Sequence, residues 1–532
     1  MENILKIKNK SINVLDCTLR DGGYCNEWYF GKDNIKKITA GLVEANINIV
    51  ECGFLTQNIS EYDENRTKFN DINQISKFIP KNREEKIFVC MMNYGEYNVE
   101  ELPNFDGKSV DGIRVAFHKK DAVNALDICK KIKEKGYKVF VQPMVSLNYT
   151  CEEFLKIIDI CNTIEAYAFY IVDSFGIMKR KDLIRLYYIV ENRLNTSIVI
   201  GYHGHNNMQM AYANAQTLLD ICGKRNIILD SSIYGMGRGA GNLNTELLIE
   251  ELNDNFETGY QLKPLLNIID EIITDFKNCN NWGYSLQNYL SAKYNSHPNY
   301  ASYLDNKKTL SIDDMNQIFA IMDGEKRNNF DKPYIEQLYE KYMSRGKLDE
   351  THLEELKRIL KNHKILILAP GKSIEKEIRK IKDFIDKEKP IVISVNFEYT
   401  DIKSDYIFIG NARRYRQMDM EKKHKFIVTS NVECLDVFLR IDYMKLLNSI
   451  QNVKDNSGLM LIKWLSILGI KKVYLAGFDG YSSDISNNYF DDKLSWIIKV
   501  NILKDKNIGL HSALEEFGKK IDIEFVTTRM YI

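Results

Sequence analysis

The stretch Asn13-Val-Leu-Asp-Cys-Thr-Leu-Arg-Asp-Gly-Gly-Tyr24 joins a short apolar run to a group of charged side chains. Val14 and Leu15 are typical of a buried strand, and the two glycines after Arg20 and Asp21 end any regular element. A carboxylate beside a guanidinium at such a point can hold a cation and an anionic substrate together. The stretch therefore predicts the mouth of a site, and the alternative is an ordinary strand-ending turn.

Helix-like segments separate this stretch from seven further β-rich runs. In Asp121–Lys135, for example, apolar residues recur at helical spacing, which is typical of the helix in a parallel βα unit. Eight such units in roughly 250 residues predict a TIM (β/α)8 barrel, with a doubly wound open sheet as the alternative. The eight runs are Ile12–Cys17, Ile47–Phe54, Lys86–Met92, Gly112–Phe117, Lys138–Met144, Ala168–Asp173, Ile198–His205 and Ile227–Ser232.

Polar side chains gather where the predicted strands end. In the seventh run His203 and His205 share a face, because residues two apart in a strand point the same way. Two imidazoles opposite Asp21 can ligate one divalent metal and leave positions open for substrate and water. We therefore predict a metal site at these three residues, although a lone histidine at a strand end is more often a surface residue. Arg114 and Ser174, near the ends of the fourth and sixth runs, are candidate substrate-binding residues.

A glycine-rich loop, Gly235-Met-Gly-Arg-Gly-Ala-Gly-Asn-Leu-Asn-Thr-Glu246, follows the eighth run. Glycines permit close approach of the backbone, and Thr245 is typical of a helix start. Such a loop can present amides to an anion, and barrels commonly bind anions after the last strand. Its alternative is a flexible loop.

Three motifs in this order resemble the DRE-TIM metallolyase superfamily and, within it, the 4-hydroxy-2-oxovalerate aldolases. They are Thr18-Leu-Arg-Asp-Gly22, His203-Gly-His205 and Gly235-Met-Gly-Arg-Gly-Ala-Gly-Asn242, and the resemblance covers about residues 12–260. It implies Mn²⁺ or Mg²⁺ at the three predicted ligands. It also implies that Arg20 contacts the oxygen of a pyruvate enolate, which the guanidinium charge can stabilise.

Tyr24 stands where the similar aldolases carry a histidine. With an ordinary pKa near ~10, a tyrosine acts as a base only through a lowered pKa or through water. In those aldolases a helical extension carries a tyrosine to the site and receives a dehydrogenase partner. Here His297 is the candidate catalytic residue with Arg20 and Tyr24, although spacing does not choose among the aromatic residues of the extension, and each is alternatively a core residue. These aromatic residues are Tyr284, Tyr289, Tyr294 and His297.

A second domain begins at Lys364-Ile-Leu-Ile-Leu-Ala-Pro-Gly-Lys-Ser373, which predicts a strand, a tight turn and a helix. This geometry suits a phosphate or nucleotide but lacks the full P-loop pattern. Four more β runs predict a Rossmann-like open α/β sheet. They are Ile391–Asn396, Tyr406–Ile409, Phe426–Thr429 and Lys472–Ala476.

This half resembles, more loosely, the nucleotide-binding part of bacterial sialyltransferase-like proteins. The resemblance rests on Ala369-Pro-Gly-Lys-Ser373, Ser394-Val-Asn396 and the segment 457–479. It implies a cytidine nucleotide or nucleotide-sugar, and a domain that only binds is also consistent with it. The candidate contacts are Gly371, Ser373, Asn396, Ser457, Gly458 and Asp479.

Composition limits the class of protein. Lys plus Arg and Asp plus Glu are both 73, which gives no support to a nucleic-acid partner. Ten cysteines without a CxxC pair indicate a reducing compartment. The longest apolar stretch, Leu459–Ile470, contains Lys463 and is too short to span a bilayer. With no secretion signal at the start, these features predict a cytoplasmic protein.

These patterns predict three parts: a TIM-barrel aldolase domain over 1–260, a helical extension and linker over 261–350, and a Rossmann-like domain over 351–532. The leading hypothesis is a class II pyruvate aldolase that acts on a 2-oxo acid and an aldehyde in the synthesis of an unusual surface sugar. A homo-oligomer or a dehydrogenase-like partner would accompany it. The alternatives are a glycosyltransferase with an accessory barrel, an acyl-CoA Claisen-type condensing enzyme, and a binding scaffold with one silent half.

Overall fold

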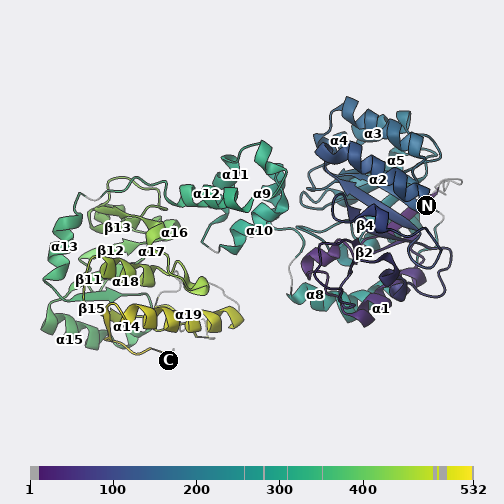
Figure 1. The fold of residues 1–532 in the computed structure, drawn as a ribbon. Helices are drawn as coiled ribbons and strands as arrows, with labels where there is room; N and C mark the ends of the chain where they lie inside the picture. The colour runs from purple at the N-terminus through teal and green to yellow at the C-terminus, as the bar shows by residue number, and fades with distance from the viewer. Residues whose placement is uncertain are drawn as a thin grey trace, which may run out of the picture. The chain divides into compact units, whose positions relative to one another are not determined.

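The chain folds into two compact units, one ending at Asp331 and one beginning at Lys332 (Figure 1). The computed structural model describes residues 11–256, 258–279, 282–307, 309–349, 351–482, 488–490 and 500–529. Each unit is described by itself below.

Eight parallel strands among the described residues close into a barrel in the first unit. Closure follows from β1, which pairs in parallel with both β2 and β9. The predicted TIM barrel is therefore confirmed, and closure excludes the open sheet. The strands are β1 (Ile12–Asp16), β2 (Ile49–Leu55), β4 (Ile87–Asn93), β5 (Gly112–Phe117), β6 (Lys138–Pro143), β7 (Ala168–Asp173), β8 (Val199–Gly204) and β9 (Ile227–Ser231); the short β3 (Lys68–Phe69) joins the edge of β2.

Alternation along the strands separates the barrel interior from the outer layer. In β7, Phe169 and Ile171 pack into the large apolar cluster that includes the helices, whereas Ala168 and Tyr170 join a cluster built from strand residues. Successive side chains of a strand point to opposite faces, so the second pair faces inward. The surrounding helices are α1 (Lys32–Glu44), α2 (Ala122–Glu134), α3 (Cys151–Ile164), α4 (Arg180–Arg193), α5 (Ala211–Ile221) and α6 (Thr245–Asn255).

A helical extension follows the barrel within the first unit. The first helices of the predicted helical extension are α7 and α8, joined by a π-helical turn over Ile269–Ile273. His297 is the N-cap of a later helix, α10. The helices of the extension are α7 (Leu262–Ile268), α8 (Thr274–Cys279), α9 (Leu286–Lys293), α10 (Pro298–Asn306) and α11 (Ile312–Ala320).

The second unit contains a seven-stranded parallel sheet in the order β14-β13-β12-β11-β10-β15-β16. From β10 the chain builds one side of the sheet out to β14, and β15 then returns to the other side of β10. The predicted strands do form one parallel sheet, the Rossmann-like character of the domain stays a prediction, and the two short strands β14 and β16 were not predicted. The strands are β10 (Ile365–Leu368), β11 (Ile391–Val395), β12 (Tyr406–Ile409), β13 (Phe426–Thr429), β14 (Leu439–Ile441), β15 (Lys472–Ala476) and β16 (Asp522–Phe525).

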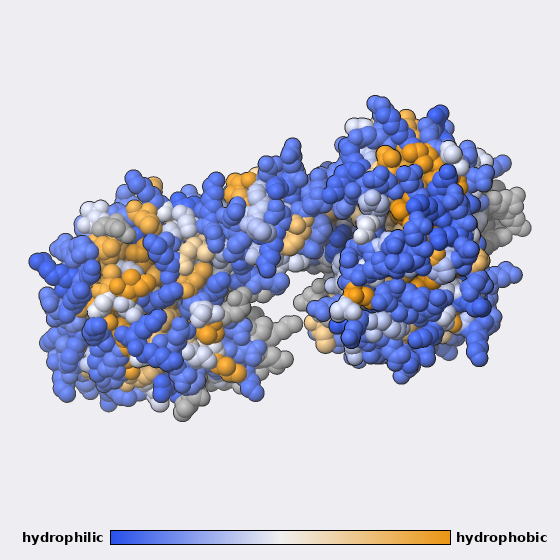
Figure 2. All heavy atoms as spheres, viewed as in Figure 1, coloured by the Kyte–Doolittle hydropathy of each residue, from blue (hydrophilic) through white to orange (hydrophobic). Residues whose placement is uncertain are grey.

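Helices flank this sheet, and hydrophilic residues cover most of the face drawn in Figure 2. Within the described ranges, no helix has both the length and the apolar character needed to cross a bilayer. The predicted apolar stretch 459–470 lies largely in α18, where most side chains are buried. The helices are α12 (Lys332–Met343), α13 (Leu353–Lys361), α14 (Ser373–Lys376), α15 (Ile378–Glu388), α16 (Ala412–Tyr415), α17 (Tyr443–Leu446), α18 (Ser457–Ile467) and α19 (Val500–Gly518).

Candidate metal centre and pockets

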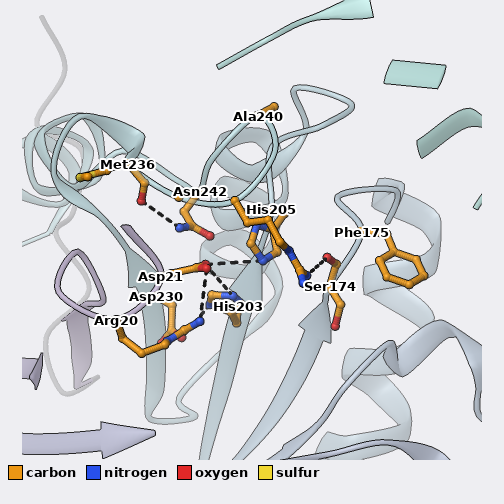
Figure 3. A network of polar contacts seen from close by, with 12 residues as sticks. Arg20, Asp21, Ser174, Phe175, His203, His205, Asp230, Met236, Ala240 and Asn242 are labelled. Carbon is orange, nitrogen blue, oxygen red and sulfur yellow. Dashed lines mark hydrogen bonds and ion pairs between the residues drawn. The ribbon is translucent and has the colours of Figure 1, made fainter. Parts of the chain in front are cut away.

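Asp21, His203 and His205 meet at the carboxyl end of the barrel strands (Figure 3). A tight turn after β1, in which the Asp21 amide donates to the Cys17 carbonyl (2.8 Å), brings the carboxylate over the barrel end. The Nε2 atoms of His203 and His205 each lie 3.5 Å from Asp21 Oδ2. Potential ligand atoms of the three residues all lie within 4.8 Å of one another, so a single cation could contact all three.

Asp21 and His205 have the protonation states that a metal site requires. Burial alone would raise the pKa of Asp21, but Arg20 and the two histidines hold it well below its usual range. Burial lowers the pKa of His205 to about 3, against the attraction of Asp21, so its imidazole is neutral. Metal ligands must be deprotonated in this way. The arrangement therefore offers one carboxylate and two imidazole nitrogens.

Buried polar atoms of the triad that lack hydrogen-bond partners indicate a binding site for a cation. Both carboxylate oxygens of Asp21 and Nδ1 of His205 are buried without a hydrogen-bond partner, and Arg20 Nη1 approaches Asp21 Oδ1 only to 3.4 Å. A buried carboxylate without donors is costly, and coordination of a cation removes that cost. The donor set thus fits a divalent metal.

Asp230 of β9 fixes the orientation of His203. Its Oδ2 lies 2.9 Å from His203 Nδ1, and this bond places the ring proton on Nδ1. The lone pair of Nε2 is then directed at Asp21. A carboxylate behind a histidine in this way is the usual support of a metal-binding imidazole.

A buried charge network lies beneath the triad. Arg20 Nε donates to Glu51 Oε2 (2.9 Å), and Arg114 Nη1 lies 2.7 Å from the same oxygen. Arg114 also bonds Asp230. Arg114 is fully buried, and two carboxylates engage its guanidinium. The residue predicted to contact substrate therefore lies under the site and supports Arg20 and Asp230.

A pocket opens above the triad. It contains the predicted Arg20, Tyr24 and Ser174 together with the three candidate ligands. It also contains Arg238. This residue was not predicted, because a single arginine in a glycine-rich loop forms no sequence pattern that indicates a site. The lining residues are Arg20, Asp21, Tyr24, Phe54, Met91, Asn93, Ala116, Gln142, Met144, Val172, Ser174, His203, His205 and Arg238.

Tyr24 forms one wall of this pocket. Its ring packs edge-on against Trp28 (4.7 Å between centroids), and the Arg238 guanidinium lies 5.3 Å from its centroid. Burial of the phenol raises the pKa of Tyr24, with Arg238 opposing the shift, although 42% of the residue is exposed. Tyr24 is therefore protonated at neutral pH and is a donor, not a base.

The glycine-rich loop uses several of its backbone amides in hydrogen bonds within the protein, so these amides are not presented to an anion. The Ala240 amide donates to Asn207 Oδ1 (2.7 Å), and the Asn242 amide donates to the Gly235 carbonyl (3.1 Å). Gly241 has φ +84, and a Cβ there would lie 1.9 Å from the Gly235 oxygen, so this position requires glycine. The expected anion site is not formed by these amides, and the loop instead supplies the side chains of Arg238 and Asn242.

Among the aromatic candidates of the extension, His297 contacts a residue that lines the pocket, Arg238. His297 Nε2 lies 3.5 Å from Arg238 Nη1, and its ring packs against Phe175. Burial, with Arg238 next in importance, lowers the pKa of His297 to about 3. Tyr294 instead stacks on Phe319 and bonds Asn316, and Tyr284 and Tyr289 do not line the pocket.

A second pocket lies at the carboxyl ends of β10, β11 and β15. Its lining includes five of the predicted nucleotide contacts: Gly371, Asn396, Ser457, Gly458 and Asp479. The sixth, Ser373, lies outside the lining, and its amide donates to Asp479 Oδ2 (2.6 Å). Ser373 therefore positions Asp479. Residues of the lining that were not predicted include Arg414, Asn456, Tyr481, Asn488 and Tyr489.

Comparisons with known proteins address the first unit. Residues 112–272 match the family model described as HMGL-like. The chain is 26% identical over 273 residues to the 4-hydroxy-2-oxovalerate aldolase of Geobacillus stearothermophilus, a match covering 50% of this chain and 77% of that protein. It is 27% identical over 269 residues to that of Carboxydothermus hydrogenoformans, with the same two shares. The solved HMG-CoA lyase of Brucella melitensis gives a TM-score of 0.41 at 15% identity, over 51% of this chain and 98% of that one.

These sequence matches support the predicted resemblance of the N-terminal part to the DRE-TIM metallolyases and, within them, to 4-hydroxy-2-oxovalerate aldolases. The predicted resemblance of the C-terminal part to sialyltransferase-like proteins is not supported by them and stays a prediction.

Proposed function

We propose that the N-terminal barrel is a divalent-metal-dependent, class II type aldolase that makes or breaks a carbon–carbon bond between a pyruvate enolate and an aldehyde. The observation that supports this proposal most strongly is the buried triad of Asp21, His203 and His205. Its potential metal-ligand atoms lie close together, and both carboxylate oxygens of Asp21 lack a hydrogen-bond partner. The similarity to proteins named 4-hydroxy-2-oxovalerate aldolase supports a lyase of this kind.

The triad would hold the metal. Buried Asn242 Oδ1 has no partner and lies beside His205 in Figure 3, so it is a further possible oxygen donor. Imidazole nitrogens suit transition metals better than Mg²⁺, which prefers oxygen ligands, so the donor set favours Mn²⁺. A divalent cation here supplies Lewis-acid stabilisation of the negative charge on a 2-oxo acid enolate.

Arg20 would bind the 2-oxo acid and stabilise the enolate oxygen. Its Nε is held by Glu51, while its Nη2 is buried without a partner. A guanidinium fixed before the reaction need not reorganise as charge develops. Ser174 lies across the same pocket as a second contact.

Tyr24 would serve as a proton donor. In the direction of bond formation the aldehyde oxygen gains a negative charge and must be protonated. A phenol with a raised pKa in the pocket is protonated and can donate that proton. His297 would act from the rim through its contact with Arg238.

Exchange of the pyruvate methyl protons in deuterated water tests this proposal, because the exchange requires the enolate but no aldehyde. Proton NMR should show that the Mn²⁺-loaded protein speeds the loss of the methyl signal above the rate with free Mn²⁺, and that excess chelator abolishes the gain. No exchange in the loaded protein, or exchange indifferent to chelator, would overturn the proposal.

For the second unit we propose a Rossmann-like domain that binds a cytidine nucleotide or nucleotide-sugar, linking the aldolase to the synthesis of a surface sugar. Its pocket lies at the point where the strand order reverses, between β10 and β15, and parallel α/β sheets bind ligands at such points. The alternative, a glycosyltransferase, needs a base in this pocket. Asp479 is the carboxylate there, and Ser373 engages it.

Thermal unfolding with added nucleotides tests the second proposal. CMP at about 100 times its Kd should stabilise the second unit by about 2.7 kcal/mol, and adenosine and guanosine monophosphates should not. Ser457→Ala in the pocket lining should reduce the shift, whereas Ser466→Ala farther along the same helix, outside that lining, should keep it. Equal shifts with all nucleotides, or none, would contradict a cytidine site.

A further inference from the structure

Arg238 brings a positive charge into the barrel pocket that no described carboxylate neutralises by an ion pair. Its Nη2 donates to the Ser174 carbonyl (3.1 Å), and its Nε is buried without a hydrogen-bond partner. The other arginines at this site differ, because Arg20 and Arg114 each pair with Glu51. A cation held in a pocket in this way is available for an anion from outside the chain.

The contact between Arg238 and His297 lacks an acceptor. His297 Nδ1 accepts from the Asn299 amide (3.2 Å) as the cap of α10, so the proton of the neutral ring is on Nε2. That Nε2–H faces Arg238 Nη1, another donor, at 3.5 Å. Two donors that face each other are satisfied together only when an acceptor oxygen lies against both.

We infer that Arg238 and His297 bind an anionic group, a carboxylate or a phosphate, on the aldehyde partner of the reaction. This inference rests on the proposed aldolase function. The two observations fit one group: its oxygen accepts from both donors, and its negative charge pairs with Arg238.

The positions of the two arginines assign this group to the aldehyde. In the proposed reaction the 2-oxo acid would be bound at the triad and by Arg20, whose Nη2 is buried without a hydrogen-bond partner. Arg238 contacts Ser174, the partly exposed Tyr24 and His297 of the extension, and so lies toward the rim. An aldehyde placed beside Tyr24 would direct its far end to this rim.

Selection follows from the same geometry. A neutral aldehyde leaves the Arg238 charge and the His297 donor unpaired, whereas an anionic aldehyde satisfies both. A site with buried polar groups discriminates strongly against a substrate that lacks the matching polar group. An apolar pocket discriminates only weakly against a substrate that carries an extra polar group. The pocket therefore favours anionic aldehydes.

Aldol addition of pyruvate to paired aldehydes tests the inference. The pairs are succinic semialdehyde against pentanal, and glyceraldehyde 3-phosphate against glyceraldehyde, with product measured by mass spectrometry. In the wild-type protein one anionic member should have a kcat/KM about 10- to 100-fold above its neutral partner, the effect of a charge-assisted hydrogen bond. Which pair shows it distinguishes carboxylate from phosphate.

The variant measurement uses the ratio of the two kcat/KM values, so a loss shared by both substrates cancels. Arg238→Gln should bring the ratio close to one, and Arg238→Lys should restore part of it. Arg193→Gln is the matched control, because Arg193 of α4 pairs with Asp159 of α3 on the surface, and it should keep the wild-type ratio. Equal use of neutral and anionic aldehydes by the wild type, or a ratio unchanged in Arg238→Gln, would overturn the inference. Absence of pyruvate exchange would instead overturn the aldolase proposal.

Discussion

Asp21→Asn is expected to slow metal-dependent pyruvate exchange by about 10³-fold or more. The substitution removes the single carboxylate of the triad while preserving its shape, and Lewis-acid stabilisation of the enolate is worth several kcal/mol, each ~1.36 kcal/mol being tenfold in rate. Exchange at saturating Mn²⁺ gives the rate effect. Calorimetric titration with Mn²⁺ should show weakened binding in parallel.

The unfolding temperature of the metal-free protein separates this effect from misfolding. In the absence of metal, Asp21→Asn should still unfold in one cooperative transition, at a somewhat lower temperature than the wild type, because the change removes the attraction between Asp21 and Arg20 that holds the pKa of the carboxylate below its usual range. Asp159→Asn, at the surface pair with Arg193, is the control and should exchange pyruvate at the wild-type rate. Unimpaired exchange in Asp21→Asn would refute the role of the triad.

Arg114→Met is expected to destabilise the barrel by about 3–5 kcal/mol. The arginine is fully buried between Glu51 and Asp230, and its removal leaves two carboxylates without their shared cation. Hydrogen exchange of peptides from β5 and β9 measures this effect in the barrel separately from the second unit.

A surface pair provides the control for this loss. Arg193→Met should cost at most about 1 kcal/mol, because its pair with Asp159 is largely exposed. Adding Asp230→Asn to Arg114→Met should recover part of the stability, since Asp230 has then lost its arginine partner, whereas Glu51 keeps its ion pair with Arg20. A cost below ~1 kcal/mol for Arg114→Met would mean that the network does not stabilise the barrel.

The strands and the triad were predictable because their signals are local. Each barrel strand is an apolar run bounded by turn residues, and the spacing of His203 and His205 alone places them on one face. β16 was missed because Asp522-Ile-Glu-Phe525 is short and half polar, as suits an edge strand.

The supporting residues were not predictable because their roles depend on strand register. Asp230 supports His203 only because β8 and β9 are neighbours, and Arg114 reaches it across the barrel interior. Arg238 and His297 meet only after the extension folds back toward the glycine loop. Contacts between distant segments leave no periodic pattern in the chain.

The closure of the barrel through β1 has a consequence for its assembly. Asp21 follows the first strand, whereas His203 and His205 come from the seventh run, so most of the barrel sequence must be in place before the ligands meet. A cation bound by these residues would then act as a reversible cross-link between the two ends of the domain. Because it binds only the closed barrel, it would stabilise that state relative to the unfolded chain. Affinity for Mn²⁺ would thus report whether the ring of strands is complete, and a chain that ends before β8 would lack the site.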